Sequence, residues 1–176
     1  MTTYNIDTAH SEIAFTVKHM MVSKVRGSFN DFEGWIKTNK EDMEGSEVYF
    51  KADVASIDTR APQRDEHLRG PEFFDIATYP ELTFKSNSFK RINGDNYEMT
   101  GQLTMHGITN EITLSVEYTG EGVNATGNPF LAFEINGAIS RKEYGITWNP
   151  AIEGGGVIVS DEVKLDLTVQ VANEEV

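Results

Sequence analysis

The stretch EVKLDLTVQV, residues 162–171, alternates apolar and polar side chains with a period of two. Its apolar positions share one face: Val163, Leu165, Leu167, Val169 and Val171. Successive side chains of a strand point to opposite faces of the sheet, so this alternation predicts an antiparallel strand with one buried face.

The same alternation recurs along the whole chain. It is found at residues 12–20, 47–56, 81–89, 97–105, 111–118 and 130–140. The segment 24–36 also alternates but loses phase near Asn30 or Asp31, which predicts a bulge that bends the strand. Together these segments make about eight strands. We therefore predict an all-β fold: one domain over residues 1–176, built as a single eight-stranded antiparallel lipocalin-like barrel.

Two segments lack this alternation. Residues 60–69 follow Asp58 and Thr59, either of which can cap a helix, and they include Pro62 and end before Gly70. They predict one short helix inserted between strands. Residues 140–156 end in three consecutive glycines and predict a mobile loop.

Composition excludes several classes of function. The net charge of −13 argues against a nucleic-acid partner and disfavours an anionic membrane surface, because phosphate groups are repelled overall. The chain has no cysteine and no long apolar run, so we expect no disulfide, no thiolate metal site and no membrane span. The opening residues lack the features of a signal peptide and predict a cytoplasmic location; a secreted protein whose leader had been removed would look the same.

Catalytic and metal signatures are weak. None of the histidines (His10, His19, His67 and His106) has a recognised metal-ligand spacing, and we expect no metal and no cofactor. No glycine-flanked nucleophile elbow is present, so we do not predict an enzyme. An enzyme that acts on a small amphiphile, with His19 or His67 as the base, is kept as an alternative.

The inward faces of the predicted strands mix bulky residues with small ones. The small residues are Gly27, Gly34, Ala52, Gly101 and Gly137. They could leave a cavity, or they could admit neighbouring phenylalanine rings. The pattern therefore leaves two options: a hollow barrel that binds a ligand, and a filled barrel that serves only as an interaction module.

Several stretches resemble the YceI-like family. They are YNIDTAHSEIAFTVKHMMVSKVRGSF, ASIDTRAPQRDEHLRGPEFFDIATYPELTF, GQLTMHGITNEITL and AISRKEYGI. The resemblance implies an elongated barrel with an apolar tunnel that binds polyisoprenoid lipids or other long-chain amphiphiles. Many members are secreted to the periplasm, whereas this sequence shows no leader. It also has SRKEYG at 140–145 where the family tends to have Asn-Arg-x-Asp-Phe-Gly.

The predicted function is binding, carriage or storage of a long-chain amphiphile such as a polyisoprenoid. The predicted tunnel lining is Phe15, Val17, His19, Phe29, Phe50, Ala52, Phe73, Phe74, Phe84, Met99, Leu103, Leu114, Phe133, Ile135 and Leu167. Arg64, Arg69 and Arg141 are the candidates for binding a head group, because the guanidinium fork matches phosphate oxygens. Alternatively, Arg64, Asp65, His67 and Arg69 brace the helix through ion pairs. Unpaired strand edges could also join two copies as a homodimer, which the resemblance makes plausible.

Overall fold

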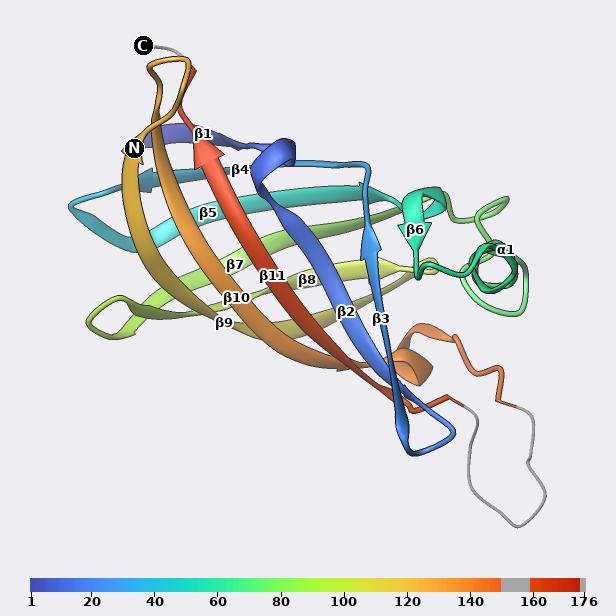
Figure 1. The fold of residues 1–176 in the computed structure, drawn as a ribbon. Helices are drawn as coiled ribbons and strands as arrows, with labels where there is room; N and C mark the ends of the chain where they lie inside the picture. Colours follow the sequence, from blue (N-terminus) through green and yellow to red (C-terminus); the bar gives the residue numbers. More distant parts are fainter. Residues whose placement is uncertain (150–158, 175–176) are drawn as a thin grey trace.

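The computed structural model describes residues 1–149 and 159–174. Figure 1 shows long, curved strands wrapped into a barrel, with the helix at residues 62–69 at one end and the N-terminus close to the end of the last strand at the other. The elements in chain order are β1 (Thr2–Ile6), η1 (Thr8–His10), β2 (Glu12–His19), β3 (Ser23–Phe29), β4 (Phe32–Asn39), β5 (Asp42–Asp53), η2 (Val54–Ser56), β6 (Ile57–Asp58), α1 (Pro62–Arg69), β7 (Glu81–Asn93), β8 (Asn96–Met105), β9 (Ile108–Val123), β10 (Pro129–Ser140), η3 (Arg141–Tyr144) and β11 (Glu162–Ala172).

The predicted eight-stranded antiparallel barrel is confirmed, although its wall contains more than eight separate strands. β11 pairs with β1 near residues 171–172 and with β2 at residues 164–168. β1 in turn pairs with β4, while β2 pairs with β3. β1 with β2, and β3 with β4, therefore each act as one long bent strand, and the other long strands complete the barrel.

The bend between β3 and β4 lies at the position predicted from the loss of phase. The backbone N–H groups of Asn30 and Asp31 leave the ladder and donate to Ser56 Oγ at 3.1 and 3.0 Å. The strand is thus interrupted rather than bulged, and a side chain from η2 satisfies both backbone donors. The corresponding bend between β1 and β2 is η1, which Asp7 caps by accepting from Ala9 N–H at 3.0 Å.

The predicted short helix is α1. Pro62 occupies its first turn and Gly70 follows its end, as expected. The prediction of its N-cap is wrong: the cap position is Ala61, which makes no side-chain capping bond. Thr59 is instead engaged by Asp65, whose carboxylate accepts from both the backbone N–H and the hydroxyl group of Thr59. A buried Asp65 therefore ties the first turn of the helix to the chain that precedes it.

The interior glycines admit aromatic rings. A Cβ atom added to Gly101 would lie 2.5 Å from the ring of Phe84, and one added to Gly27 would overlap the ring of Phe15. Part of the barrel interior is thus filled by phenylalanine rings that pack against glycines, which is the second of the two options left open by the sequence. Residues 150–156 of the predicted mobile loop at 140–156 lie outside the described residues, whereas Arg141–Tyr144 form η3. No helix in the described parts of the chain is long and apolar enough to cross a membrane.

Candidate ligand-binding cavity

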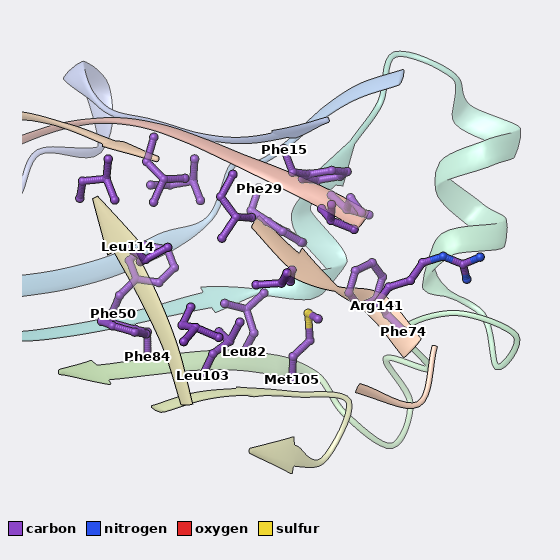
Figure 2. A pocket seen from close by; sticks show the side chains of 18 of the residues that line it. Phe15, Phe29, Phe50, Phe74, Leu82, Phe84, Leu103, Met105, Leu114 and Arg141 are labelled. Atoms are coloured by element: carbon purple, nitrogen blue, oxygen red, sulfur yellow. The ribbon is translucent and has the colours of Figure 1, made fainter. Parts of the chain in front are cut away.

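A cavity of about 510 Å³ remains inside the barrel despite these rings. Its walls come from the inward faces of the long strands, from α1 and from the segment after η3. Figure 2 shows rings and branched side chains from several strands pointing into one shared space. The predicted residues that line it are Phe15, Val17, His19, Phe29, Phe50, Phe73, Phe74, Phe84, Met99, Leu103, Leu114, Phe133, Ile135 and Leu167.

Ala52 does not line the cavity, so this part of the predicted lining is wrong. It points to the predicted face but is fully buried, at 0% exposure, between strands that pair it with Phe32 and Leu82. Its small side chain is covered by its neighbours before it can reach the open space. Alternation determines which face a residue occupies, but not whether larger neighbours cover it.

Phenylalanine rings form the wall nearest to α1. The ring centroids of Phe15 and Phe29 lie 5.6 Å apart, and Phe29 meets Phe74 edge to face at 6.1 Å. Phe73 and Phe74, from the loop after the helix, both line the cavity, as predicted for that stretch. The aromatic pairs hold these rings in defined orientations, so this part of the wall is preorganised.

Polar side chains in the lining come mainly from the end of the barrel that carries α1. They are Thr59, Gln63, Arg64, His67, Arg141 and His19, with Trp35, Tyr49 and Trp148 as the aromatic residues that carry a polar atom. Among the described residues, no carboxylate lines the cavity. A ligand with one polar end would therefore find its hydrogen-bonding partners near α1, and those partners are neutral or cationic.

Arg141 and Thr59 are the buried members of this set, each at 4% exposure. The guanidinium of Arg141 donates to the backbone carbonyls of Ser160 (2.9 Å), Ile146 (2.9 Å), Trp148 (3.0 Å) and Val159 (3.2 Å). Burial lowers the pKa of Arg141 from its usual value, although an arginine remains protonated at any physiological pH. Arg141 therefore places a positive charge in the wall and holds the segment after η3 against the barrel.

The three candidate head-group arginines separate into two groups. Arg64 lines the cavity and donates through Nε to Thr59 Oγ1 at 2.8 Å and through Nη2 to Thr59 O at 2.6 Å. Arg69 does not line the cavity; it donates to Ala55 O at 2.9 Å and Ile57 O at 3.2 Å. Arg69 is thus a structural anchor between α1 and η2, and of the three arginines only Arg64 and Arg141 line the cavity.

The helix is braced mainly through bonds to backbone and to Thr59, rather than by ion pairs between its own charged side chains. The interaction between Arg69 and Glu66 spans 3.6 Å and lies at the surface, where such pairs contribute little. His67 pairs with Glu72 at 3.1 Å and packs edge to face against Phe73 and Trp148, with centroids 5.0 and 4.8 Å away. Asp65, His67 and Arg69 each have a protein partner, as the structural reading of this stretch requires.

His10 and His106 do not line the cavity, and each has a hydrogen-bond partner of its own. His10 pairs with Asp7 at 2.8 Å, and His106 bonds to the carbonyl of Tyr144 at 2.8 Å. None of the identified hydrogen-bond partners of His10, His67 and His106 is a hydroxyl group that a base could activate. Within residues 1–149 and 159–174, no cluster of three or more potential metal ligands occurs.

Sequence reasoning missed Trp148, Gln63 and Thr59 in the lining. Trp148 lies outside any strand, so no periodicity marks it. Gln63 and Thr59 belong to the helix and its lead-in, where the helical period is too short to show an inward face. The only feature of the sequence that pointed to Gln63 and Thr59 was their closeness to Arg64 along the chain.

A YceI-like domain model matches residues 4–171. The chain belongs to the YceI-like family. A UPF0312 protein of Staphylococcus aureus strain USA300 is 34% identical over 176 residues, which cover 99% of this chain and 100% of the relative. The crystal structure of BcnA from Burkholderia cenocepacia is 25% identical, with a TM-score of 0.81 over 94% of this chain and 98% of that one.

A polyisoprenoid binding domain from Saccharophagus degradans, implicated in plant cell wall breakdown, has a TM-score of 0.68 and covers 97% of this chain and 98% of that chain. Its identity of 17% means that this likeness concerns the fold alone. The same barrel fold is thus found in a protein whose sequence differs from this chain at most positions.

Proposed function

We propose that this protein binds a long-chain amphiphile, such as a polyisoprenoid, and carries or stores it with the tail inside the barrel. The observation that carries the proposal is the cavity of about 510 Å³, walled by apolar side chains and polar mainly at one end. An apolar cavity of about 150 Å³ accepts a benzene ring, so by proportion this one holds roughly 20 carbon atoms. The fold shared with a polyisoprenoid binding domain supports this ligand class.

The cationic residues near α1 support a head group that is anionic or a strong hydrogen-bond acceptor. The four bonds of Arg141 to carbonyls leave one of the five N–H groups of its guanidinium for a ligand. The two bonds from Arg64 to Thr59 leave three. A carboxylate or a phosphate at this end of the cavity would find cationic donors and, among the described lining residues, no opposing carboxylate.

The two alternative functions are less well supported. A filled barrel that acts only as an interaction module does not fit a cavity of this size. An enzyme with His19 or His67 as the base needs a second reactive group in contact with that base. The observed partners of His67 are a surface carboxylate and aromatic rings, and among the described residues the ring of His19 has no identified partner. We therefore propose a binding protein and no catalytic role.

Native mass spectrometry of protein purified from its natural host tests the proposal. The expected result is an additional mass that matches one amphiphile, is removed by organic extraction and returns when the extracted lipid is added back. A protein that carries no such mass and takes up no amphiphile after extraction would show that the proposal is wrong.

A further inference from the structure

The turn between β2 and β3 exposes three consecutive apolar residues. Met20, Met21 and Val22 are 43%, 60% and 85% exposed. Figure 1 shows this turn projecting from the barrel at the end away from the two termini. Soluble proteins avoid contiguous exposed apolar side chains unless these contact a partner.

The backbone of the turn is costly to maintain. Met20 and Met21 have φ values of 55° and 66°, in the left-handed region, and the turn is closed by Val22 N–H donating to His19 O at 3.3 Å. Asn-Gly is favoured where both central residues of a hairpin turn have positive φ, because side chains like that of methionine strain this conformation. Methionine at both positions therefore makes the turn less stable than Asn-Gly would, while it places apolar side chains at the tip.

Two lysines flank the tip in an arrangement that is also unfavourable for the fold. Lys18 and Lys24 are exposed and directly opposite each other across the β2–β3 ladder. Like charges in this position repel. Among the described residues neither lysine has an ion-pair partner, whereas Arg26 on the same hairpin is neutralised by Glu12 and Asp166.

The surroundings of the hairpin differ from the rest of this acidic chain. Residues 13–30 contain no Asp or Glu, although the chain has 28 of them. Asp161 follows Ser160, which pairs with Lys18, but its carboxylate accepts from Ser140 Oγ at 2.6 Å and Lys142 N–H at 3.0 Å. Salt limits the reach of each charge to about 8 Å, so an approaching surface senses the lysines rather than the net charge of −13.

The tip adjoins the end of the cavity that His19 helps to line, which we name the cavity mouth. His19, the last residue of β2, lines the cavity, as do Val17 and Val25 on the paired strands behind it. A hairpin that enters a surface at its tip would therefore bring the cavity mouth next to that surface. Apolar side chains between lysines match a lipid interface, where apolar groups enter the acyl region and ammonium groups meet anionic head groups.

We propose that the β2–β3 hairpin tip, Lys18–Lys24, docks onto lipid bilayers that contain anionic lipids and so places the cavity mouth at the membrane surface. The docking rests on the hairpin itself and does not depend on which ligand the cavity binds. It is reversible, because three apolar side chains and two lysines provide far less anchoring than an inserted helix.

Vesicle flotation tests the docking with the full-length protein. The vesicles are phosphatidylcholine alone or phosphatidylcholine mixed with phosphatidylglycerol. The wild type is expected to float with the mixed vesicles and much less with phosphatidylcholine alone. The double variant Lys18→Gln/Lys24→Gln is expected to lose about fivefold or more of the bound fraction on the mixed vesicles.

A second double variant, Met20→Asn/Met21→Gly, separates docking from folding. It gives the turn its preferred residues, so the melting temperature is expected to rise by about 2–4 °C. Its flotation is nevertheless expected to fall by about tenfold, because two apolar side chains are lost from the tip. The matched control is Val123→Asp, which changes a valine that is 69% exposed in a hairpin near the termini and should leave flotation unchanged.

Three results would overturn the proposal: a wild type that stays with the soluble fraction, tip variants that float as well as the wild type, and light scattering that shows the tip holding two copies of the chain together. Uptake of a fluorescent long-chain carboxylate in vesicle-free solution is measured on the same variants. Loss of flotation with normal uptake would show that the hairpin acts in docking and not in ligand binding. Normal flotation without uptake contradicts the proposed ligand binding and leaves the docking intact.

Discussion

The size of the cavity predicts how affinity depends on the length of a ligand tail. With space for roughly 20 carbon atoms, each added methylene is buried until the tail reaches about that length. A buried methylene contributes about 0.8 kcal/mol, which corresponds to about a fourfold change in Kd. Ordering a flexible tail offsets part of this, so we expect a gain of about two- to fourfold per carbon, followed by a plateau.

The substitution Ile135→Trp tests whether the cavity sets the plateau. Ile135 is on β10 and lines the cavity, and tryptophan has six more non-hydrogen atoms in its side chain. At the packing density of a protein interior they displace about six carbons of the ligand, so the plateau should move to about 14 carbons. The matched control is Asn136→Trp, which places the same ring on the exposed outer face of the neighbouring position.

The assay is displacement of a fluorescent long-chain probe by a homologous series of straight-chain carboxylates, with occupancy confirmed by native mass spectrometry. Affinity that does not depend on tail length would refute the assignment of the tail to the barrel. A plateau that stays at the same length in the Ile135→Trp protein would refute the volume argument, provided that the control behaves like the wild type.

Three further predictions concern stability and selectivity. Gly101→Ala should lower the free energy of unfolding in urea by about 1–3 kcal/mol, because the new Cβ atom would lie 2.5 Å from the Phe84 ring; an unchanged midpoint would contradict this packing. Burial raises the pKa of Asp161, but hydrogen bonds from Ser140 Oγ and from a backbone N–H, with nearby cations, outweigh it and hold the pKa below 3.8. The ionised form of Asp161 therefore stabilises the fold above that pH. Asp161→Asn should lower the free energy of unfolding by about 1–2 kcal/mol at neutral pH, and by progressively less as the pH falls below 3.8. A loss of stability that does not vary with pH would contradict the assignment. Arg64→Gln should reduce the preference for a carboxylate over the matching alcohol by about three- to tenfold in the displacement assay, and equal selectivity would place the head group elsewhere. The homodimer and the cytoplasmic location stay predictions, for which light scattering and cell fractionation are the measurements.

The strands were predictable because each has one face in the interior and one in water. The alternation that marks Val163 and Leu165 is a direct record of that asymmetry, and it also located the bend near Asn30. How deeply each inward-facing residue is buried was not predictable from this alternation. Ala52 has the right phase but is covered by its neighbours, which depends on strands that are distant in sequence.

The polar residues around α1 were predictable as a group but not individually. The sequence shows several arginines close together, and Arg64 and Arg69 look equivalent in it. Their roles differ because the carbonyl groups of Ala55 and Ile57 lie within reach of Arg69 and not of Arg64. Which carbonyl groups each arginine can reach depends on the path of the backbone before the helix. The periodicity of side chains in the sequence does not reveal that path.

The pairing of β11 with the first strands also determines when the barrel can form during synthesis. Ser11 Oγ donates to the carbonyl of Gln170, 159 residues further along the chain. β1 and β2 therefore wait with an unpaired edge until β11 has left the ribosome, and contacts between residues so far apart in sequence slow folding. A nascent chain of this protein is thus exposed to strand-edge aggregation for nearly the whole of its translation, and its yield in a cell should depend on chaperones that cover the N-terminal strands.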